Sequence, residues 1–228
     1  MRVAETFTSR QGEGKLTGVE SFFVRTSGCN LRCWFCDTPY ASWNPVGESH
    51  SIDSLVQQAV QSGCRHVVLT GGEPLLPESC VALTQQFAAT GLHLTVETAG
   101  TIFRDIAYDL LSLSPKLAAS VPDASDHPRW NELHERRRMP IDTMRRLIEV
   151  SKAFQVKFVV DSRDEFDEVD EVVRLLQVEP DDVWIMPQGS TNESLDAAAS
   201  WLTPWAHSQG YRYCDRMQIR WYGNRRGT

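Results

Sequence analysis

The chain has 228 residues and a mass of 25.8 kDa, long enough for one domain or two small ones to bury a sizeable core. It has 23 basic and 30 acidic residues, a net charge of −7, so it lacks the positive excess that holds a nucleic-acid backbone. Its apolar runs are too short for a membrane span or an export signal. We therefore expect a folded cytoplasmic protein that binds neither nucleic acid nor a membrane.

Strands and helices alternate along the chain at spacings typical of parallel βαβ units. The helix predicted at residues 51–62, for example, has an apolar face, Ser51 as its N-cap and Gly63 as its end. About six such units are present, fewer than an eightfold barrel requires. The predicted helices are 51–62, 77–89, 103–111, 142–153, 164–176 and 194–209, and the predicted strands are 20–25, 66–70, 92–97, a short one toward 114, 155–160, 183–186 and 211–213.

Residues 118–140 interrupt this alternation. They contain several prolines and the charged run at residues 135–138, so we expect a loop or an insertion with a short helix. Such a segment is also a candidate cover for an active site. No repeat, low-complexity tract or linker divides the chain, so the sequence predicts a single domain over residues 1–228.

Three of the six cysteines, Cys29, Cys33 and Cys36, lie within eight residues in a C-x3-C-x2-C pattern. Three thiolates on one short loop can converge on a single soft metal centre. A disulfide framework is disfavoured, since a chain of this size does not need such staples. Three interpretations compete: a structural zinc site that takes a fourth ligand from elsewhere, an iron–sulfur cluster with one iron free for a substrate or cofactor, and three thiols that are close only by chance, which the rarity of cysteine disfavours.

A second motif, Thr70-Gly71-Gly72-Glu73-Pro74, directly follows the strand predicted at residues 66–70. Such a turn by itself is common in loops. Active sites of parallel α/β folds, however, lie at the carboxyl ends of the strands. The motif is therefore a candidate binding loop beside the cysteines.

The cysteine pattern, with Phe35 before its third cysteine, resembles the signature of the radical S-adenosylmethionine enzymes, and residues 70–74 resemble their Gly-Gly-Glu motif. The resemblance implies a [4Fe-4S] cluster on the three cysteines, whose open iron binds S-adenosylmethionine and whose electron releases a 5′-deoxyadenosyl radical. It also implies an incomplete (β/α)6 TIM-like barrel, often a homodimer, and an electron donor such as flavodoxin or ferredoxin. The implied contacts of S-adenosylmethionine are Phe35, Asp37, Gly72, Glu73, Ser114, Lys116, Met186 and Gln188.

The pattern Glu-Thr-Phe-x3-Arg-Gln-Gly-Glu-Gly at residues 5–14, together with residues 23–31 and 36–41, is similar to the 7-carboxy-7-deazaguanine synthase family. This similarity implies conversion of 6-carboxy-5,6,7,8-tetrahydropterin into 7-carboxy-7-deazaguanine, with ring contraction and loss of ammonia, in queuosine and 7-deazapurine biosynthesis. Thr38 is then expected to offer an oxygen to Mg2+. The residues expected to bind the substrate are Gln11, Gly12, Glu13, Arg25, Thr70 and Thr228.

Two positions depart from the family pattern. Ala99 stands where asparagine is common, and Gln218 stands about where a histidine is expected. Two alternatives remain open beside this interpretation: another radical enzyme, such as an activase that abstracts hydrogen from a protein glycine, and a zinc-binding module without catalysis. Iron, sulfide and zinc content would separate the last from the others.

Overall fold

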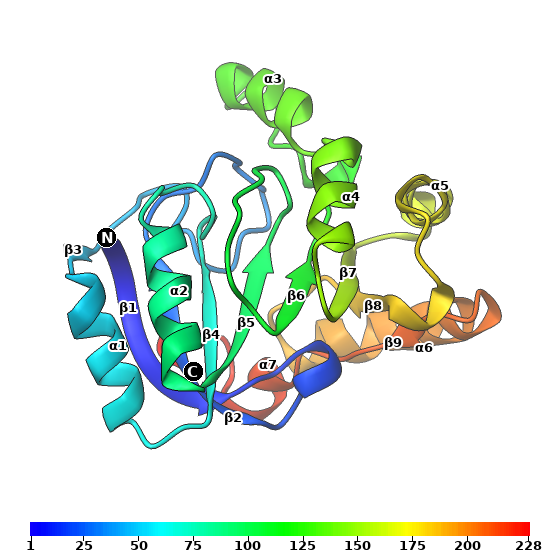
Figure 1. The fold of residues 1–228 in the computed structure, drawn as a ribbon. Helices are drawn as coiled ribbons and strands as arrows, with labels where there is room; N and C mark the ends of the chain where they lie inside the picture. Colours follow the sequence, from blue (N-terminus) through cyan, green and yellow to red (C-terminus); the bar gives the residue numbers. More distant parts are fainter.

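The computed structural model describes all 228 residues, which form one nine-stranded sheet with helices packed around it (Figure 1). The strand order is β3-β1-β2-β4-β5-β6-β7-β8-β9. The strands are β1 (Arg2–Arg10), β2 (Glu20–Thr26), β3 (Glu48–Ser49), β4 (His66–Gly71), β5 (His93–Thr98), β6 (Leu110–Leu113), β7 (Phe154–Val160), β8 (Val183–Pro187) and β9 (Arg212–Tyr213).

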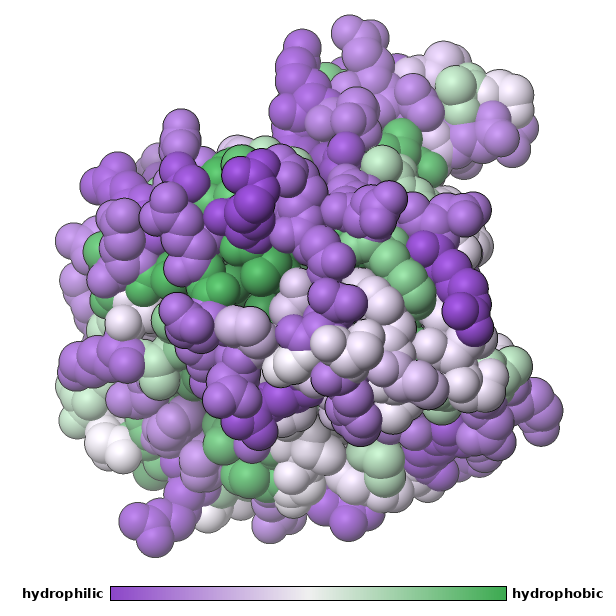
Figure 2. All heavy atoms as spheres, turned by 90° about the vertical axis from the view of Figure 1, so that its right-hand side faces the viewer, coloured by the Kyte–Doolittle hydropathy of each residue, from purple (hydrophilic) through white to green (hydrophobic).

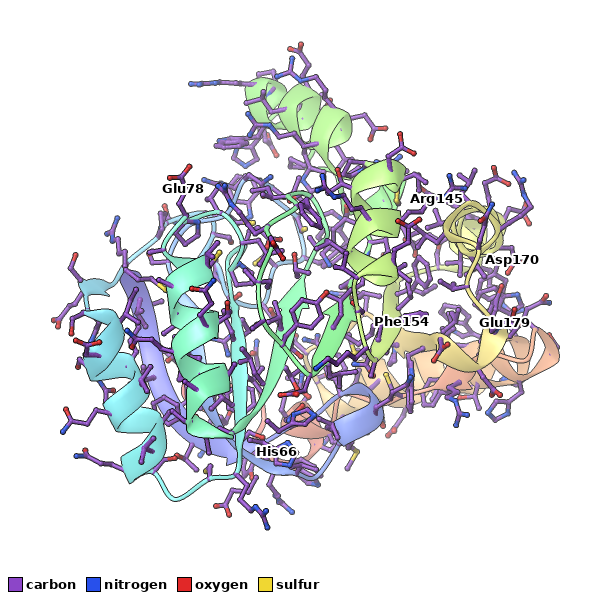
Figure 3. All side chains as sticks on the ribbon, in the orientation of Figure 1. His66, Glu78, Arg145, Phe154, Asp170 and Glu179 are labelled. Atoms are coloured by element: carbon purple, nitrogen blue, oxygen red, sulfur yellow. The ribbon has the colours of Figure 1, made fainter.

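From β2 onward, neighbouring strands of this sheet are parallel, whereas β1 runs antiparallel to both β2 and β3. The outer strands β3 and β9 do not pair with each other, so the barrel stays open. The predicted α/β class with an incomplete parallel barrel is confirmed. In Figure 3, His66 lies where β4 begins and Glu78 lies beyond its other end, which gives the direction of the parallel strands.

The helices are α1 (Ile52–Gln61), α2 (Cys80–Thr90), α3 (Pro128–Arg137), α4 (Ile141–Glu149), α5 (Phe166–Leu176), α6 (Asn192–Ser208) and α7 (Met217–Tyr222). Ser51 caps α1 as predicted, since its side chain accepts a hydrogen bond from the backbone N–H of Ser54 at 3.1 Å. Gly63 follows the end of this helix with a φ of 75°, a conformation that favours glycine.

The helix predicted at residues 103–111 is wrong. The chain from the end of β5 to β6 contains no helix, and Leu110 and Leu111 belong to β6 instead. Tertiary contacts explain the difference, because Phe103 packs under the guanidinium of Arg146 at 3.7 Å and Arg104 donates to the carbonyl of Leu75. The strand β1 and the helix α7 are also absent from the prediction.

A hydrophobic core lies between the sheet and its helices, and leucine and valine side chains dominate it. On the side of the molecule that faces the viewer in Figure 2, polar residues prevail and apolar residues show in patches among them. Helix α3 stands out from the body at the top of Figure 1. None of the helices has the length and apolar character that a membrane span requires.

Candidate active site

A cavity of about 620 Å³ opens at the carboxyl ends of the parallel strands, bounded also by the cysteine loop and the last residues of the chain. All of the predicted site residues line it except Glu73 and Gln188. The predicted residues that it brings together are Gln11, Gly12, Glu13, Arg25, Cys29, Cys33, Phe35, Cys36, Asp37, Thr38, Thr70, Gly72, Ser114, Lys116, Met186 and Thr228.

The three motif cysteines lie on a loop without helix or strand that follows β2. Burial raises the pKa of the Cys29 thiol to about 12 and that of the Cys33 thiol to about 11, and the nearby carboxylate of Glu73 adds to the effect at Cys29. A soft metal centre would displace these protons on binding. No three His, Cys, Asp or Glu side chains surround a single ion position. Three thiols of one loop that line one cavity form a donor set that suits an iron–sulfur cluster.

Glycine is required where the loop after β4 meets the cysteine loop. A Cβ on Gly72 would lie 2.1 Å from the carbonyl oxygen of Gly28 and 2.6 Å from that of Ala41. The backbone N–H of Glu73 donates to the carbonyl of Gly28 at 2.9 Å. This close approach joins the two predicted motifs at one wall of the cavity.

The carboxylate of Glu73 is buried in the protein instead of lining the cavity. It accepts hydrogen bonds from the backbone N–H of Leu75 at 3.0 Å, the hydroxyl of Thr98 at 2.7 Å and the backbone N–H of Ala99 at 3.0 Å. Burial raises the pKa of Glu73. The contact with Ala99 uses only its backbone N–H, so the alanine that stands in place of the family's asparagine does not disturb the hydrogen bonds of Glu73. Gln188 also lies outside the lining, and its backbone N–H donates to the carbonyl of Val160.

Replacing Glu73 with alanine is expected to lower the free energy of unfolding by about 3 kcal/mol, because three donors, two of them in buried hydrogen bonds, lose their acceptor. Urea unfolding of the full-length protein measures this change. The exposed Glu78 serves as the control, since its side chain is 89% exposed and Glu78→Ala should change stability by less than about 0.5 kcal/mol. Equal unfolding midpoints for both variants would contradict the assigned role of Glu73.

A group of charged residues, several of them buried, surrounds Glu13 on the cavity lining. Lys157 of β7 is only 4% exposed, and its ammonium pairs with Glu13 and lies 3.7 Å from Glu97. Arg216 lies 3.5 Å from Glu13 and pairs with Asp37. Burial alone would raise the pKa of Glu13, but the charges of Lys157 and Arg216 outweigh it and lower this pKa to about 2. Glu13 is therefore held as a carboxylate.

Gln218 completes the surroundings of Glu13. Its Nε2 donates to Oε1 of Glu13 at 2.6 Å, while its own Oε1 is buried without a partner. A Cβ on Gly12 would lie 2.0 Å from that oxygen, so glycine is needed here to admit the amide. The glutamine that replaces the expected histidine thus keeps a polar contact with Glu13.

Glu5 joins three segments of the chain. Its carboxylate accepts from Nε of Arg25 at 2.8 Å, from the hydroxyl of Tyr40 at 2.7 Å and from Nε of Arg226 at 2.9 Å. The two terminal amino groups of Arg25 have no protein partner, and Arg25 lines the cavity. A guanidinium fork is therefore free to bind an anion. The C-terminal residue Thr228 lies on the same cavity.

Three further predicted site residues, Thr38, Ser114 and Lys116, line the cavity. The ammonium of Lys116 donates to the carbonyl of Ser114 at 2.8 Å and to its hydroxyl at 2.7 Å. The Thr38 hydroxyl lies 3.7 Å from Sγ of Cys36.

Sequence reasoning missed several residues of the lining, chiefly Lys157, Glu97, Arg216, Tyr40 and Arg226. The sequence does contain a signal for one of them, Lys157. Residues of a parallel strand are buried on both faces, so a lysine in the middle of the apolar strand β7 needs a carboxylate partner.

Comparison with known proteins identifies the family. Residues 23–176 match the Radical SAM superfamily. A 7-carboxy-7-deazaguanine synthase of Rhodopirellula baltica is 62% identical over 226 residues, covering 99% of this chain and 88% of that protein. The enzyme of that name from Halobacterium salinarum is 44% identical over 229 residues, covering 95% of this chain and 88% of that protein.

The crystal structure of QueE from Escherichia coli has the same fold, with a TM-score of 0.66 over 95% of this chain and 93% of that one, at 20% identity. These relatives exclude the two alternatives that the sequence left open, a glycyl-radical activase and a zinc-binding module without catalysis. The chain belongs to the radical SAM superfamily and, within it, to the 7-carboxy-7-deazaguanine synthase family.

Proposed function

We propose that the protein converts 6-carboxy-5,6,7,8-tetrahydropterin into 7-carboxy-7-deazaguanine, in a pathway toward queuosine or another 7-deazapurine, with a [4Fe-4S] cluster, S-adenosylmethionine and Mg2+. The observation that carries this proposal is that the cysteine loop and the segment with Gln11, Glu13 and Arg25 line one cavity. A cofactor held by the loop and a substrate held by the segment would therefore meet inside it. Such positioning accounts for much of the catalysis that a protein adds to a reactive cofactor.

Cys29, Cys33 and Cys36 would hold the cluster, which together with S-adenosylmethionine supplies a carbon radical that can remove a hydrogen atom from the substrate. Gly72 lets the backbone of the loop after β4 pack against the cysteine loop, and both loops line the cavity. Phe35 and Met186 add apolar surface to the lining. An apolar wall excludes water from a reactive intermediate.

The charged groups of the cavity suit a carboxylated pterin. Arg25 has two free amino groups that can bind a carboxylate as a fork. Glu13 is held as a carboxylate and can accept hydrogen bonds from the amino and ring N–H groups of a pterin. Gln11 is buried, and because its Nε2 donates to Ser21 at 3.0 Å, its oxygen is left as an acceptor. Thr70 and Thr228 also lie on the lining.

Thr38 is the residue that we propose to bind Mg2+. Its hydroxyl lies on the cavity beside Cys36, whereas the neighbouring carboxylate of Asp37 is paired with Arg216. A single protein oxygen, completed by substrate and water, suits an ion that gives up its water reluctantly.

The partners follow from the same proposal. We infer that the enzyme works in the cytoplasm as a homodimer, and that flavodoxin or ferredoxin supplies its electron. The family resemblance supports these inferences, and light scattering and reduction assays with each donor protein would check them.

Product analysis tests the proposed function. The protein is loaded with iron and sulfide without oxygen and incubated with dithionite, S-adenosylmethionine, Mg2+ and 6-carboxy-5,6,7,8-tetrahydropterin. Mass spectrometry should then find 7-carboxy-7-deazaguanine. Release of 5′-deoxyadenosine without this product would overturn the proposed substrate, and a protein that takes up zinc but no iron would overturn the proposed chemistry.

Replacing Arg25 with methionine is expected to raise the KM for the pterin about a hundredfold, because a bidentate pair with a buried carboxylate is lost. Arg25→Lys should give an intermediate value, since an ammonium keeps the charge but not the fork. Steady-state kinetics measure both, with Arg65→Met on the exposed turn before β4 as the control. An unchanged KM in Arg25→Met would show that Arg25 does not bind the substrate.

A further inference from the structure

The segment that interrupts the alternation of strands and helices packs against the outside of the cysteine loop. It comprises the short helical turn Ala118–Ser120 and the projecting helix α3. Although sequence reasoning considered this segment a possible cover for the active site, no residue from 118 to 137 lines the cavity. Its hydrogen bonds to the cysteine loop fall at residues 30–34, between the first two cluster cysteines and just past the second.

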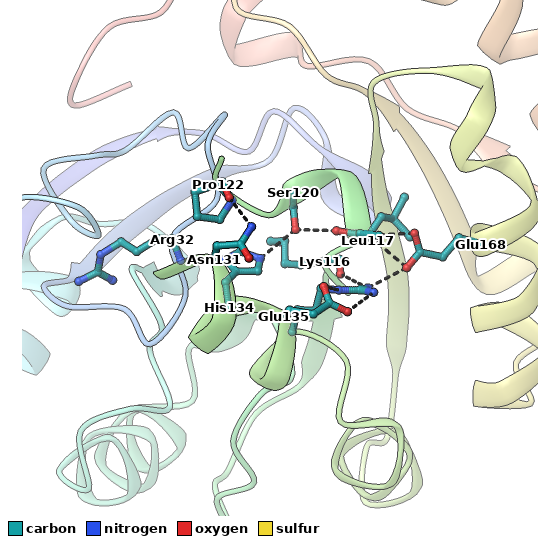
Figure 4. Close-up of polar contacts among 11 residues, drawn as sticks. Arg32, Lys116, Leu117, Ser120, Pro122, Asn131, His134, Glu135 and Glu168 are labelled. Atoms are coloured by element: carbon teal, nitrogen blue, oxygen red, sulfur yellow. Dashed lines mark hydrogen bonds and ion pairs between the residues drawn. The ribbon is translucent and has the colours of Figure 1, made fainter. Parts of the chain in front are cut away.

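His134 of α3 lies at the centre of these contacts (Figure 4) and is completely buried. Its Nδ1 is 3.0 Å from the backbone nitrogen of Arg32, and its Nε2 is 2.9 Å from the hydroxyl of Ser120. That hydroxyl is 2.6 Å from the carbonyl oxygen of Leu117.

The roles in this chain of hydrogen bonds are determined by its ends. The backbone N–H of Arg32 can only donate, so Nδ1 of His134 must be an acceptor without a proton. The carbonyl of Leu117 can only accept, so the Ser120 hydroxyl donates to it and accepts from Nε2–H of His134. Burial lowers the pKa of His134 to about 4, which agrees with a neutral ring. Only this one assignment of donors and acceptors gives every polar group in this series of hydrogen bonds a partner.

Further contacts hold the same stretch of backbone. The carbonyl of Ser120 accepts from the backbone N–H of Trp34 at 3.2 Å, and the carbonyl of Ala119 accepts from the indole N–H of Trp34 at 2.7 Å. Arg137 donates to the carbonyl of Asn30 at 3.2 Å. These contacts substitute for the internal hydrogen bonds that a loop without helix or strand lacks.

The side chain of Arg32 completes the connection. Its guanidinium lies 4.0 Å from the centre of the Trp130 ring on α3, and one of its amino groups donates to the carbonyls of Cys29 and Leu31, both at 2.7 Å. The far end of α3 is tied to the body, because Arg138 donates to Glu168 of α5 at 2.7 Å.

We propose that residues 118–137 form a brace for the cysteine loop and that His134 is its central positioning residue. His134 acts through the backbone N–H of Arg32, the residue before Cys33, and so sets where the Cys33 thiol lies. The inference rests on the proposed function only in that these cysteines hold an iron–sulfur cluster. The backbone contacts themselves belong to the protein without it.

The test compares His134→Ala and His134→Asn with Arg136→Ala, a change on the exposed side of the same helix. The Asn side-chain oxygen can take the place of Nδ1, so His134→Asn keeps the acceptor for Arg32. Two measurements use the full-length protein: hydrogen exchange at residues 29–36 before loading with iron and sulfide, and afterwards the rate of iron loss to a chelator together with the electron paramagnetic resonance spectrum of the reduced cluster.

In His134→Ala we expect exchange at residues 29–36 and iron loss to be about tenfold faster, the factor that one ordinary buried hydrogen bond provides. The resonance spectrum should change, the KM for the pterin should stay the same, and His134→Asn should restore most of the loss. Unchanged exchange and iron loss with a raised KM would overturn the brace in favour of a cover. Equal defects in the Asn and Ala variants would overturn the role of the Arg32 contact.

If His134→Ala does not fold, Ser120→Ala takes its place, since it keeps the contact of Nδ1 with Arg32 and removes the hydroxyl that bonds to Nε2 and to the carbonyl of Leu117. The exchange measurement needs neither substrate nor cluster. A protein that makes no 7-carboxy-7-deazaguanine but shows the expected exchange would therefore contradict the proposed function and leave the brace supported.

Discussion

Replacing Cys33 with alanine is expected to abolish both cluster binding and turnover. The variant keeps two thiols on the loop, and two thiolates do not hold a cluster that requires three or four protein ligands. Because Cys33 lines the cavity and its removal deletes a single sulfur, the fold should remain intact. Iron and sulfide analysis, the visible absorbance of the loaded protein and the yield of 5′-deoxyadenosine measure the effect.

Cys64→Ala is the matched control, because Cys64 is also a free cysteine but lies outside the cavity. It should load iron and sulfide like the unaltered protein. A Cys33→Ala protein that retained a full cluster and normal turnover would show that another residue supplies the third ligand.

Replacing Lys157 with methionine should lower both stability and activity. The substitution nearly conserves volume, but it leaves the carboxylates of Glu13 and Glu97 without their ammonium. Removing one partner of a buried ion pair costs about 3–5 kcal/mol of unfolding free energy. Turnover should fall about a hundredfold, since Glu13 would no longer be held at its binding position. Urea unfolding and product assays measure the two effects, with Lys152→Met on the exposed surface as the control.

The loss of stability in Lys157→Met should depend on pH, because it acts through the pKa of Glu13. In the folded protein the pKa of Glu13 is lowered from 4.5 to about 2, so its contribution to stability is complete above pH 4.5 and is lost as the pH falls toward 2. Lys157→Met removes most of that contribution. The difference in stability between the two proteins should therefore shrink as the pH falls from 4.5. A difference that is constant over this interval would contradict the assigned pairing.

Local patterns explain which parts of the fold could be predicted. The parallel strands β4, β7 and β8 are short apolar runs that are buried on both faces, and α1 has an N-cap and a glycine at its end. The irregular segment before β6 was predicted as a helix because its apolar spacing is helical. Its real conformation depends on contacts with Arg146 and Leu75, which lie far away in the sequence.

The same distinction applies to the site. The spacing of the three cysteines by itself indicates a soft metal centre, whereas the roles of Gly72 and Arg25 were inferred from the family resemblance of the motifs that contain them. The partners that hold the charged residues come from distant segments: Lys157 is 144 residues from Glu13, and Arg216 is 179 residues from Asp37. No local pattern records such pairs, although a lysine in an apolar strand indicates that one exists.

The most direct test of the account is a competition between two pterins for the active site of the loaded protein. The loaded protein is offered an equimolar mixture of 6-carboxy-5,6,7,8-tetrahydropterin and the same pterin without its carboxyl group, and mass spectrometry follows both substrates and their products. Because the cavity joins the cysteine loop to the free guanidinium of Arg25, only the carboxylated pterin should be consumed, with 7-carboxy-7-deazaguanine as the product. Consumption of both pterins at equal rates, or of neither while 5′-deoxyadenosine is released, would contradict it.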